Sequence, residues 1–151
     1  MTQARLPFDV DDPSVDAVTI FCDGGSRGNP GPAAIGAVVL DATTDPPTPL
    51  ASVSEAIGVA TNNVAEYRAL LAGLDAAEPL RAHTLHVRAD SLLMIKQLRG
   101  EYRVKHENLK PLHAEARAKL AAYDVVDLQH VPRAQNIEAD ALVNAALDAL
   151  G

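Results

Sequence analysis

The hydrophobic pattern of the first sixty residues predicts three strands joined by turns. Apolar and β-branched residues run without interruption over 17–23, which is the pattern of a strand covered on both faces. Stretches rich in glycine, asparagine and proline, which favour turns, separate this run from two more apolar runs, at 33–40 and 50–59. Because the connecting stretches are short, we expect an antiparallel meander.

Helical spacing takes over after residue 60. Apolar residues between Asn63 and Ala77 recur three and four positions apart, as on one face of a helix. The rest of the chain predicts, in order, a strand over 84–88, helices over 92–100 and 109–120, a strand over 125–131 and a helix over 137–150. This order predicts an α/β fold, in which the meander and two parallel strands form a five-stranded mixed sheet with helices on both faces.

Length and composition fit a single soluble domain. The chain has 151 residues, of which 48% are hydrophobic and 22% charged. Its longest apolar run, about eight residues, is too short for a membrane span, and residues 1–16 lack the apolar run of a secretory signal. One cysteine, Cys22, excludes an internal disulfide and a multi-cysteine zinc site. We therefore expect a cytoplasmic protein with no membrane partner.

The charge of the chain is unevenly distributed. The net charge of −7 by itself argues against a nucleic-acid partner. Residues 1–16 carry four aspartates and one arginine, and we expect them to form a flexible acidic arm before a domain over 17–151. Residues 96–119 carry seven basic and three acidic side chains. A solvated helix face and a phosphate-binding surface explain this basic segment equally well.

Four carboxylates stand at the ends of predicted elements: Asp23, Glu66, Asp90 and Asp140. They converge on one edge of the sheet if the first and fourth strands are neighbours. Asp23 follows an apolar strand and has no helix to cap, so its burial requires a nearby cation. The other three also fit a purely structural interpretation: a capping box from Asn63 to Glu66, an N-cap at Asp90, and a favourable helix dipole at Asp140.

The donor atoms in this set indicate the kind of metal. Carboxylate oxygens without a cysteine or histidine set favour Mg²⁺ or Mn²⁺ over zinc. Two such ions about 4 Å apart can clamp the attacking and leaving oxygens of a phosphodiester. A hard-metal centre for phosphodiester chemistry is therefore the functional hypothesis for the four acids.

Four motifs, in this order, resemble those of the type 1 ribonuclease H family. They are Thr19–Gly31 (TIFCDGGSRGNPG), Thr61–Glu66 (TNNVAE), Asp90-Ser91 and Asn136–Asp140 (NIEAD), and with their elements they span residues 17–150. The resemblance implies a ribonuclease H-like fold. It also implies a metal-dependent endonuclease that hydrolyses the RNA strand of RNA–DNA hybrids by a two-metal-ion mechanism, leaving 3′-hydroxyl and 5′-phosphate ends.

The resemblance also assigns roles to residues. Asp23, Glu66, Asp90 and Asp140 would be the catalytic ligands of two Mg²⁺ ions, with Mn²⁺ as a possible substitute. Contacts to the hybrid would come from Gly24, Gly25, Ser26, Asn29, Asn62, Asn63 and Arg133. Short amide side chains and glycine backbone can approach a minor groove and its ribose 2′-hydroxyls. We expect a monomer, with no protein partner implied.

Two departures from the family pattern qualify this assignment. The basic segment 96–119 is short and has no tryptophan, so the chain resembles a compact lineage without the basic protrusion that grips the DNA strand. The loop before the last acid is shortened to residues 131–136, which leaves Arg133, or less directly His130, near the place of the family's loop histidine. The alternative function is a catalytically silent hybrid-binding or protein-interaction module on the same fold, against which the intact acidic quartet argues.

Overall fold

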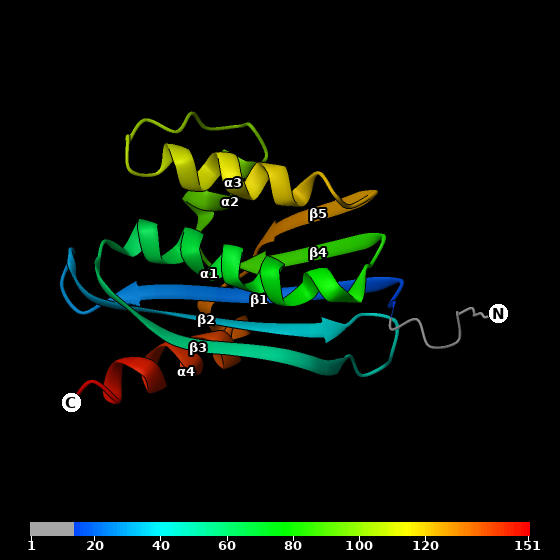
Figure 1. Cartoon of the computed structure of the whole chain (residues 1–151), viewed down its shortest axis with the longest axis horizontal. Coiled ribbons are helices and arrows are strands. Elements are labelled where there is room, and N and C mark those ends of the chain that lie inside the picture. The colour runs from blue at the N-terminus through cyan, green and yellow to red at the C-terminus, as the bar shows by residue number, and fades with distance from the viewer. Residues whose placement is uncertain (1–13) are drawn as a thin grey trace.

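The computed structural model describes residues 14–151, and its elements follow the predicted order (Figure 1). In chain order they are β1 (Ala17–Ser26), β2 (Gly31–Asp41), β3 (Thr48–Ala60), α1 (Asn62–Ala77), η1 (Glu78–Leu80), β4 (Thr84–Ala89), α2 (Leu92–Leu98), α3 (Lys110–Leu120), β5 (Val125–His130), η2 (Arg133–Gln135) and α4 (Ile137–Asp148). No helix among these residues is long and apolar enough to cross a membrane.

The strands form one mixed sheet in the order β3-β2-β1-β4-β5. β1 pairs with β2 and β2 with β3 in antiparallel fashion, whereas β1 with β4 and β4 with β5 are parallel. The predicted meander and the two parallel strands are therefore confirmed. Because β1 and β4 are parallel neighbours, their carboxyl ends lie at the same edge of the sheet.

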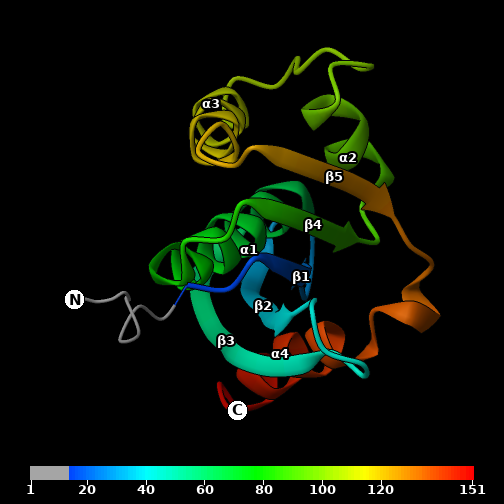
Figure 2. The ribbon, with the colours of Figure 1, turned by 90° about the vertical axis from the view of Figure 1, so that its right-hand side faces the viewer.

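Helices cover both faces of the sheet, as the sequence predicts (Figure 2). The main core lies on the face covered by α1, α2 and α3, and β1 contributes Val18, Ile20 and Cys22 to it. On the other face α4 packs against β1, β2 and β3, and Ala34, Val143 and Leu147 form a small apolar cluster. β1, at the centre of the sheet, is thus held from both sides.

The first strand is longer than predicted. It continues past Asp23 through Gly24, Gly25 and Ser26, which pair with residues 33–35 of β2. The glycines look like turn formers in the sequence, but here both lie in the strand, and Gly24 allows α1 to approach it closely. The turn between β1 and β2 consists of residues 27–30.

The predicted acidic arm over 1–16 lies mostly outside the described residues, which begin at Ser14. The described end is attached to the domain. The Val15 backbone N–H donates to Leu80 O at 3.0 Å, and the N–H groups of His83 and Thr84 both donate to Asp16 O at 3.1 Å. Residues 15 and 16 thus connect the chain to the start of β4.

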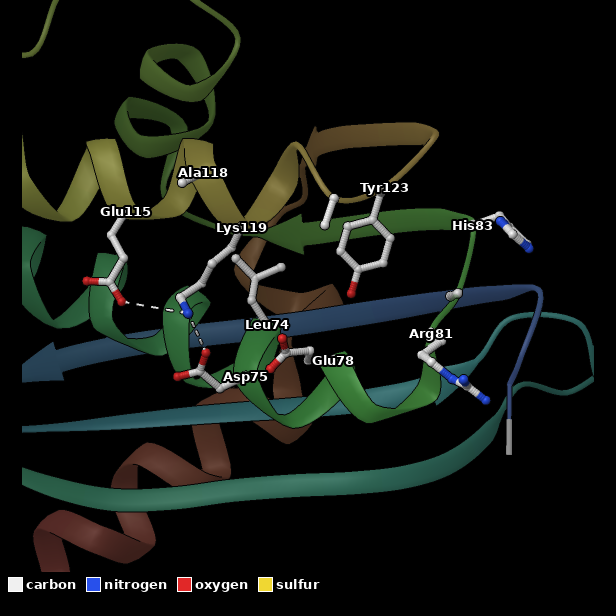
Figure 3. A pocket seen from close by; sticks show the side chains of 11 residues that line it. Leu74, Asp75, Glu78, Arg81, His83, Glu115, Ala118, Lys119 and Tyr123 are labelled. Atoms are coloured by element: carbon white, nitrogen blue, oxygen red, sulfur yellow. Dashed lines mark ion pairs between the residues drawn. The ribbon is translucent and has the colours of Figure 1, made fainter. Parts of the chain in front are cut away.

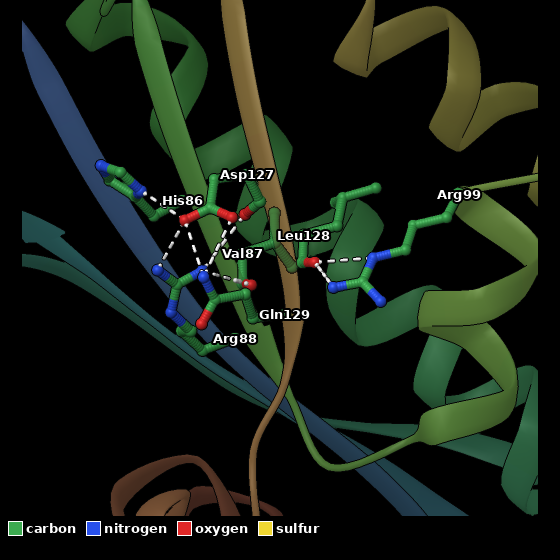
Figure 4. A network of polar contacts seen from close by, with 7 residues as sticks. All are labelled: His86, Val87, Arg88, Arg99, Asp127, Leu128 and Gln129. Carbon is green, nitrogen blue, oxygen red and sulfur yellow. Dashed lines mark hydrogen bonds and ion pairs between the residues drawn. The ribbon is translucent and has the colours of Figure 1, made fainter.

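A polar network joins β4 and β5 (Figure 4). Asp127 Oδ2 accepts from Arg88 Nη2 at 2.9 Å and lies 3.1 Å from His86 Nδ1, while Gln129 Nε2 donates to both Asp127 carboxylate oxygens at 3.2 Å. The Arg88 hydrogen bond is the main reason why the pKa of Asp127 is lowered. Arg99, the C-cap of α2, donates from Nε to Leu128 O at 3.0 Å. These bonds tie the edge strand to its neighbours.

Candidate metal centre

Two carboxylates of the site come from neighbouring strand ends. Cys22 of β1 is the partner of Ala89 of β4 in the parallel register, so the residues that follow them, Asp23 and Asp90, lie next to each other. Glu66 reaches the same place from α1. One carboxylate oxygen from each of these three residues lies within 4.8 Å of the other two. The structure thus brings together three of the four acids that the sequence singles out.

The position of Glu66 depends on close packing between α1 and β1. A Cβ atom added at Gly24 would lie 2.2 Å from Ala65 O, a backbone atom of α1. Only glycine permits this approach, which places the second turn of α1 against the end of β1. The helix begins at the N-cap Thr61, whose side chain accepts from Val64 N at 3.2 Å.

The fourth acid, Asp140, is brought to Asp23 by α4. A Cβ added at Gly36 would lie 2.4 Å from Ala139 O, so the first turn of α4 lies almost on β2. Just before this helix, the side chain of Asn136 donates from Nδ2 to Cys22 O at 2.9 Å. The Asp140 carboxyl group is close enough to Asp23 to raise the pKa of Asp23. All four acids therefore gather around the end of β1.

The electrostatics of the cluster are those of crowded acids. Asp23 is 7% exposed, and burial, followed by the charge of Asp90 and then by Asp140 and Glu66, raises its pKa to about 8. The pKa of Glu66 is raised to about 7, chiefly by burial and also by Asp90, against the lowering effects of Ser91 and Arg133. Arg133 forms an ion pair with this cluster: its Nε lies 3.8 Å from Asp90 Oδ2.

Hard oxygen donors this close together fit a divalent cation. Their mutual repulsion is relieved only if protons or positive charge enter the cluster, and a hard cation prefers carboxylate ligands. Geometry and donor chemistry therefore both match the magnesium or manganese hypothesis. Cys22 adds no competing ligand, because it is buried on the opposite face of β1 and burial raises the pKa of its thiol.

The helix-cap interpretation is wrong for two of the acids. Thr61, not Asn63, caps α1, so Glu66 is not part of a capping box. Ser91, not Asp90, caps α2, with its hydroxyl accepting from Met94 N at 3.2 Å. Asp140 does lie in the first turn of α4, where the helix dipole favours an acid. Asp90 and Glu66 are thereby left without a capping role.

Three of the residues predicted to contact a hybrid, Ser26, Asn29 and Asn62, form a hydrogen-bonded group beside the acids. Asn62 Oδ1 accepts from Ser26 N at 2.9 Å and from Ser26 Oγ at 3.2 Å, and Asn62 N donates to Asn29 Oδ1 at 3.0 Å. Gly24 and Gly25 belong to the same end of β1, and Asn63 lies half-buried in the first turn of α1. The β1–β2 turn and the start of α1 are thus locked together.

The loop before α4 contributes Arg133. This residue lies in η2 with its side chain 80% exposed, next to Asp90. His130, at the end of β5, is exposed. Of the two residues expected near the place of the family's loop histidine, Arg133 is therefore the one that forms an ion pair with an acid of the cluster.

Two residues at the site carry roles that the sequence reasoning missed. Ser91 caps α2 and hydrogen-bonds Glu66. Asn136 is 1% exposed, and its Oδ1 has no hydrogen-bond partner among the described residues. Both stand inside motifs that the sequence shows, immediately beside Asp90 and at the start of the NIEAD segment. The available signal was an uncharged polar residue directly after Asp90, and another one four positions before Asp140.

The basic segment is only partly available for a ligand. Lys96 pairs with Glu101 at 3.4 Å, and Arg99 is held by Leu128 O. Arg103 and Lys105 are exposed and take part in no ion pair with a described residue. They line a hollow of about 460 Å³ together with Tyr102 and His106.

Comparisons with known proteins agree with this geometry. Residues 21–146 match the family model described as reverse transcriptase-like. The chain is 51% identical over 132 residues to the bifunctional protein Rv2228c of Mycobacterium tuberculosis, covering 87% of this chain and 36% of that protein. It is 44% identical over 131 residues to ribonuclease HI of Halobacterium salinarum, covering 87% of this chain and 64% of that protein. The chain thus spans about a third of the length of the mycobacterial relative.

Solved structures show the same fold. The N-terminal RNase H domain of Rv2228c superposes with a TM-score of 0.84 at 49% identity, covering 89% of this chain and 95% of that one. LC11-RNase H1, solved in complex with an RNA/DNA hybrid, gives a TM-score of 0.80 at 39% identity, covering 89% and 99%. Together with the four motifs and the fold, these matches show that the chain belongs to the type 1 ribonuclease H family.

Proposed function

We propose that this chain is an endoribonuclease that hydrolyses the RNA strand of RNA–DNA hybrids. The observation that carries the proposal is the convergence of Asp23, Glu66 and Asp90, joined by Asp140, at one edge of the sheet. Relatives named ribonuclease HI, and a related structure that contains an RNA/DNA hybrid, support the substrate class.

The four acids fit two divalent cations, Mg²⁺ with Mn²⁺ as a substitute. When bound, the two ions would supply an activated water and charge compensation at the leaving oxygen, which yields 3′-hydroxyl and 5′-phosphate ends. Asp23 would hold the metal from the buried side, because it is the most enclosed of the three clustered acids. Glu66, Asp90 and Asp140 would complete the ligand set from three different elements.

Substrate recognition would come from the neighbouring amide groups. Asn29, Asn62 and Asn63, with Ser26 and the backbone of Gly24 and Gly25, present short polar groups that suit a minor groove. A ribose 2′-hydroxyl both donates and accepts hydrogen bonds, so amide side chains can select RNA over DNA at this position. Arg133 would contact a phosphate, since its guanidinium is exposed beside Asp90.

The test is a cleavage assay on labelled RNA–DNA hybrid, duplex RNA and duplex DNA, each with Mg²⁺, Mn²⁺ or a chelator. We expect cleavage of the RNA strand of the hybrid only when a metal is present. Asp23→Asn and Asp90→Asn should each lower the rate by more than about a hundredfold, which exceeds the usual effect of losing an outer partner of a metal ligand. Asp124→Asn changes an exposed acid just before β5, is the matched control and should keep full activity.

The same assay decides against the silent-module alternative. A protein that binds the hybrid but leaves it intact with either metal would support that alternative. Full cleavage by Asp23→Asn or Asp90→Asn would instead show that the acidic cluster is not the catalytic site.

A further inference from the structure

A cavity of about 620 Å³ lies between the C-terminal ends of α1 and α3 (Figure 3). Its volume falls in the range of small-molecule sites in proteins, about 300–1,000 Å³. The wall is largely apolar and consists of Leu74, Ala82, Ala118, Ala122 and Tyr123. The cavity is therefore large enough to enclose the carbon skeleton of one small molecule.

The cavity is remote from the candidate metal centre. His83, just before β4, lines the cavity, whereas Asp90 follows the last residue of this strand. A strand of six residues spans about 20 Å. A molecule in the cavity is therefore separated from the acids of the metal centre by the length of β4, and the two sites share no residue.

The rim of the cavity carries three carboxylates around one amine (Figure 3). Lys119 Nζ lies 2.7 Å from Asp75 Oδ1 and 3.9 Å from Glu115 Oε2. The third carboxylate, that of Glu78, forms no ion pair with a described residue. Burial raises the pKa of Tyr123, and the charge of Glu78 raises it further. An unbalanced negative charge therefore lies next to the aromatic part of the wall.

Two other basic residues of the lining do not offset this charge. Figure 3 shows the side chains of Arg81 and His83 pointing away from Glu78 and Lys119. His83 lies 3.1 Å from Asp124, outside the cavity lining, and its side chain is largely exposed. The charge that faces the cavity is therefore negative.

The helix ends add to the same field. The C-terminal end of a helix carries about half a negative charge, which basic side chains usually offset. The last turn of α1 has no basic residue; it contains Asp75, and Glu78 is the C-cap. α3 does have Lys119 in its last turn, but Asp75 of α1 holds that amine. Acids at the C-terminal end of a helix break a local rule of helix stability, and such exceptions are typical of ligand sites.

We propose that this cavity binds a small organic cation, an ammonium or guanidinium group carried on an apolar body. The apolar body would pack against Leu74, Ala118 and Tyr123, and the cation would lie beside Glu78 at the end of α1. The carboxylate and the helix dipole both favour a positive charge there. The ring of Tyr123 adds an aromatic face on which a cation can rest.

Three probes of similar shape separate the effect of charge from that of apolar packing: 4-phenylbutylamine, 4-phenylbutanol and 4-phenylbutyrate. Each is titrated into the ¹⁵N-labelled protein in saturating Mg²⁺, and the backbone amide shifts of residues 74–83 and 115–123 are followed. We expect the amine to bind with a Kd of about 1 mM and the alcohol about tenfold more weakly. The carboxylate should not bind.

Two variants test the residues of the site. Glu78→Gln removes the charge and keeps the shape, so it should weaken binding of the amine about tenfold and leave that of the alcohol unchanged. Ala118→Leu fills the apolar wall and should weaken binding of both. Glu55→Gln is the matched control, because Glu55 is an exposed acid of β3 outside the cavity lining, and it should change neither affinity.

Each other outcome overturns the proposal. Equal affinities for the three probes, or no binding of any, would mean that the cavity does not select a cation. Amine-induced shifts centred on Asp23, Glu66 and Asp90 would place the cation at the metal centre instead. Unchanged binding of the amine by Glu78→Gln would show that the carboxylate at the end of α1 does not hold it.

Discussion

At the residue scale, Asp23 carries the main electrostatic cost of the site. Its carboxylate is buried, and the other three acids of the cluster all raise its pKa. A sequence that keeps an acid in this position loses stability in the metal-free state, because a buried charge without a partner is unfavourable. Such a cost is typical of functional sites, where a ligand supplies the missing partner.

This cost predicts how pH affects the metal-free protein. The pKa of Asp23 is about 8 in the folded chain and about 3.8 without the fold, so the folded state holds the proton to higher pH. The stability that Asp23 contributes is therefore full below about pH 4 and falls as the pH rises toward 8. In chelator at pH 8, Asp23→Asn should raise the free energy of unfolding by about 2 kcal/mol, which is less than the full shift would imply because the acids share their protons.

Urea unfolding of both proteins between pH 4 and 8 measures this difference. It should be small at pH 4 and grow with pH. Added Mg²⁺ should then raise the melting temperature of the unmodified protein more than that of Asp23→Asn, because the variant lacks a ligand. A stability difference that does not vary with pH would contradict the proposed protonation of Asp23.

At the element scale, the site depends on helices that touch strands through backbone atoms. A Cβ at Gly24 would lie 2.2 Å from Ala65 O, whereas a Cβ at Gly25 would have its nearest neighbour at 3.8 Å. Gly24→Ala must therefore push α1 away from β1 and should cost more than about 2 kcal/mol of stability. Gly25→Ala is the adjacent control and should cost less than about 1 kcal/mol. Thermal unfolding compares the two, and equal losses would mean that the close approach of α1 is unimportant.

The hydrogen bond from Asn136 Nδ2 to Cys22 O couples α4 to β1 one residue before Asp23. Asn136→Ala removes this buried hydrogen bond, which should cost about 1–3 kcal/mol. It also frees the helix that carries Asp140, so we expect metal affinity to fall about 10–100-fold. Gln135→Ala, an exposed neighbour in η2, should change neither quantity. Urea unfolding and a calorimetric Mn²⁺ titration measure the two effects, and unchanged metal affinity would limit Asn136 to a structural role.

The elements also show what a sequence can predict. The strands and the helices follow from local hydrophobic period and chain order, and the structure confirms them. The extension of β1 through Gly24 to Ser26 does not follow, because it depends on how α1 packs there. Nor does the role of Asn136, whose bond joins residues 114 positions apart. Local patterns locate elements, whereas close backbone approaches and long-range hydrogen bonds are set by tertiary packing.

At the scale of the whole molecule, charge is separated along the chain. Of the net charge of −7, residues 1–16 supply −3 and the four acids −4, so the remainder is neutral. Divalent cations at the acids would cancel the second contribution, which removes the objection that an acidic chain cannot bind nucleic acid. Within this neutral remainder, residues 96–119 carry an excess of basic side chains, and these can bind a phosphate backbone.

The structure narrows that surface to Arg103 and Lys105, because Lys96 and Arg99 are already engaged. If each of the two cations binds a phosphate, it displaces counterions, and binding weakens as salt is added. Arg103→Ala and Lys105→Ala should each reduce the slope of log KM against log salt for hybrid cleavage by about 0.7–0.9. Lys110→Ala removes a cation of the same segment that is paired with Glu107, and it should leave the slope unchanged. Equal slopes in all three variants would assign the basic segment to ordinary solvation, and phosphate contacts would then have to come from residues nearer the acids, with Arg133 the first to test.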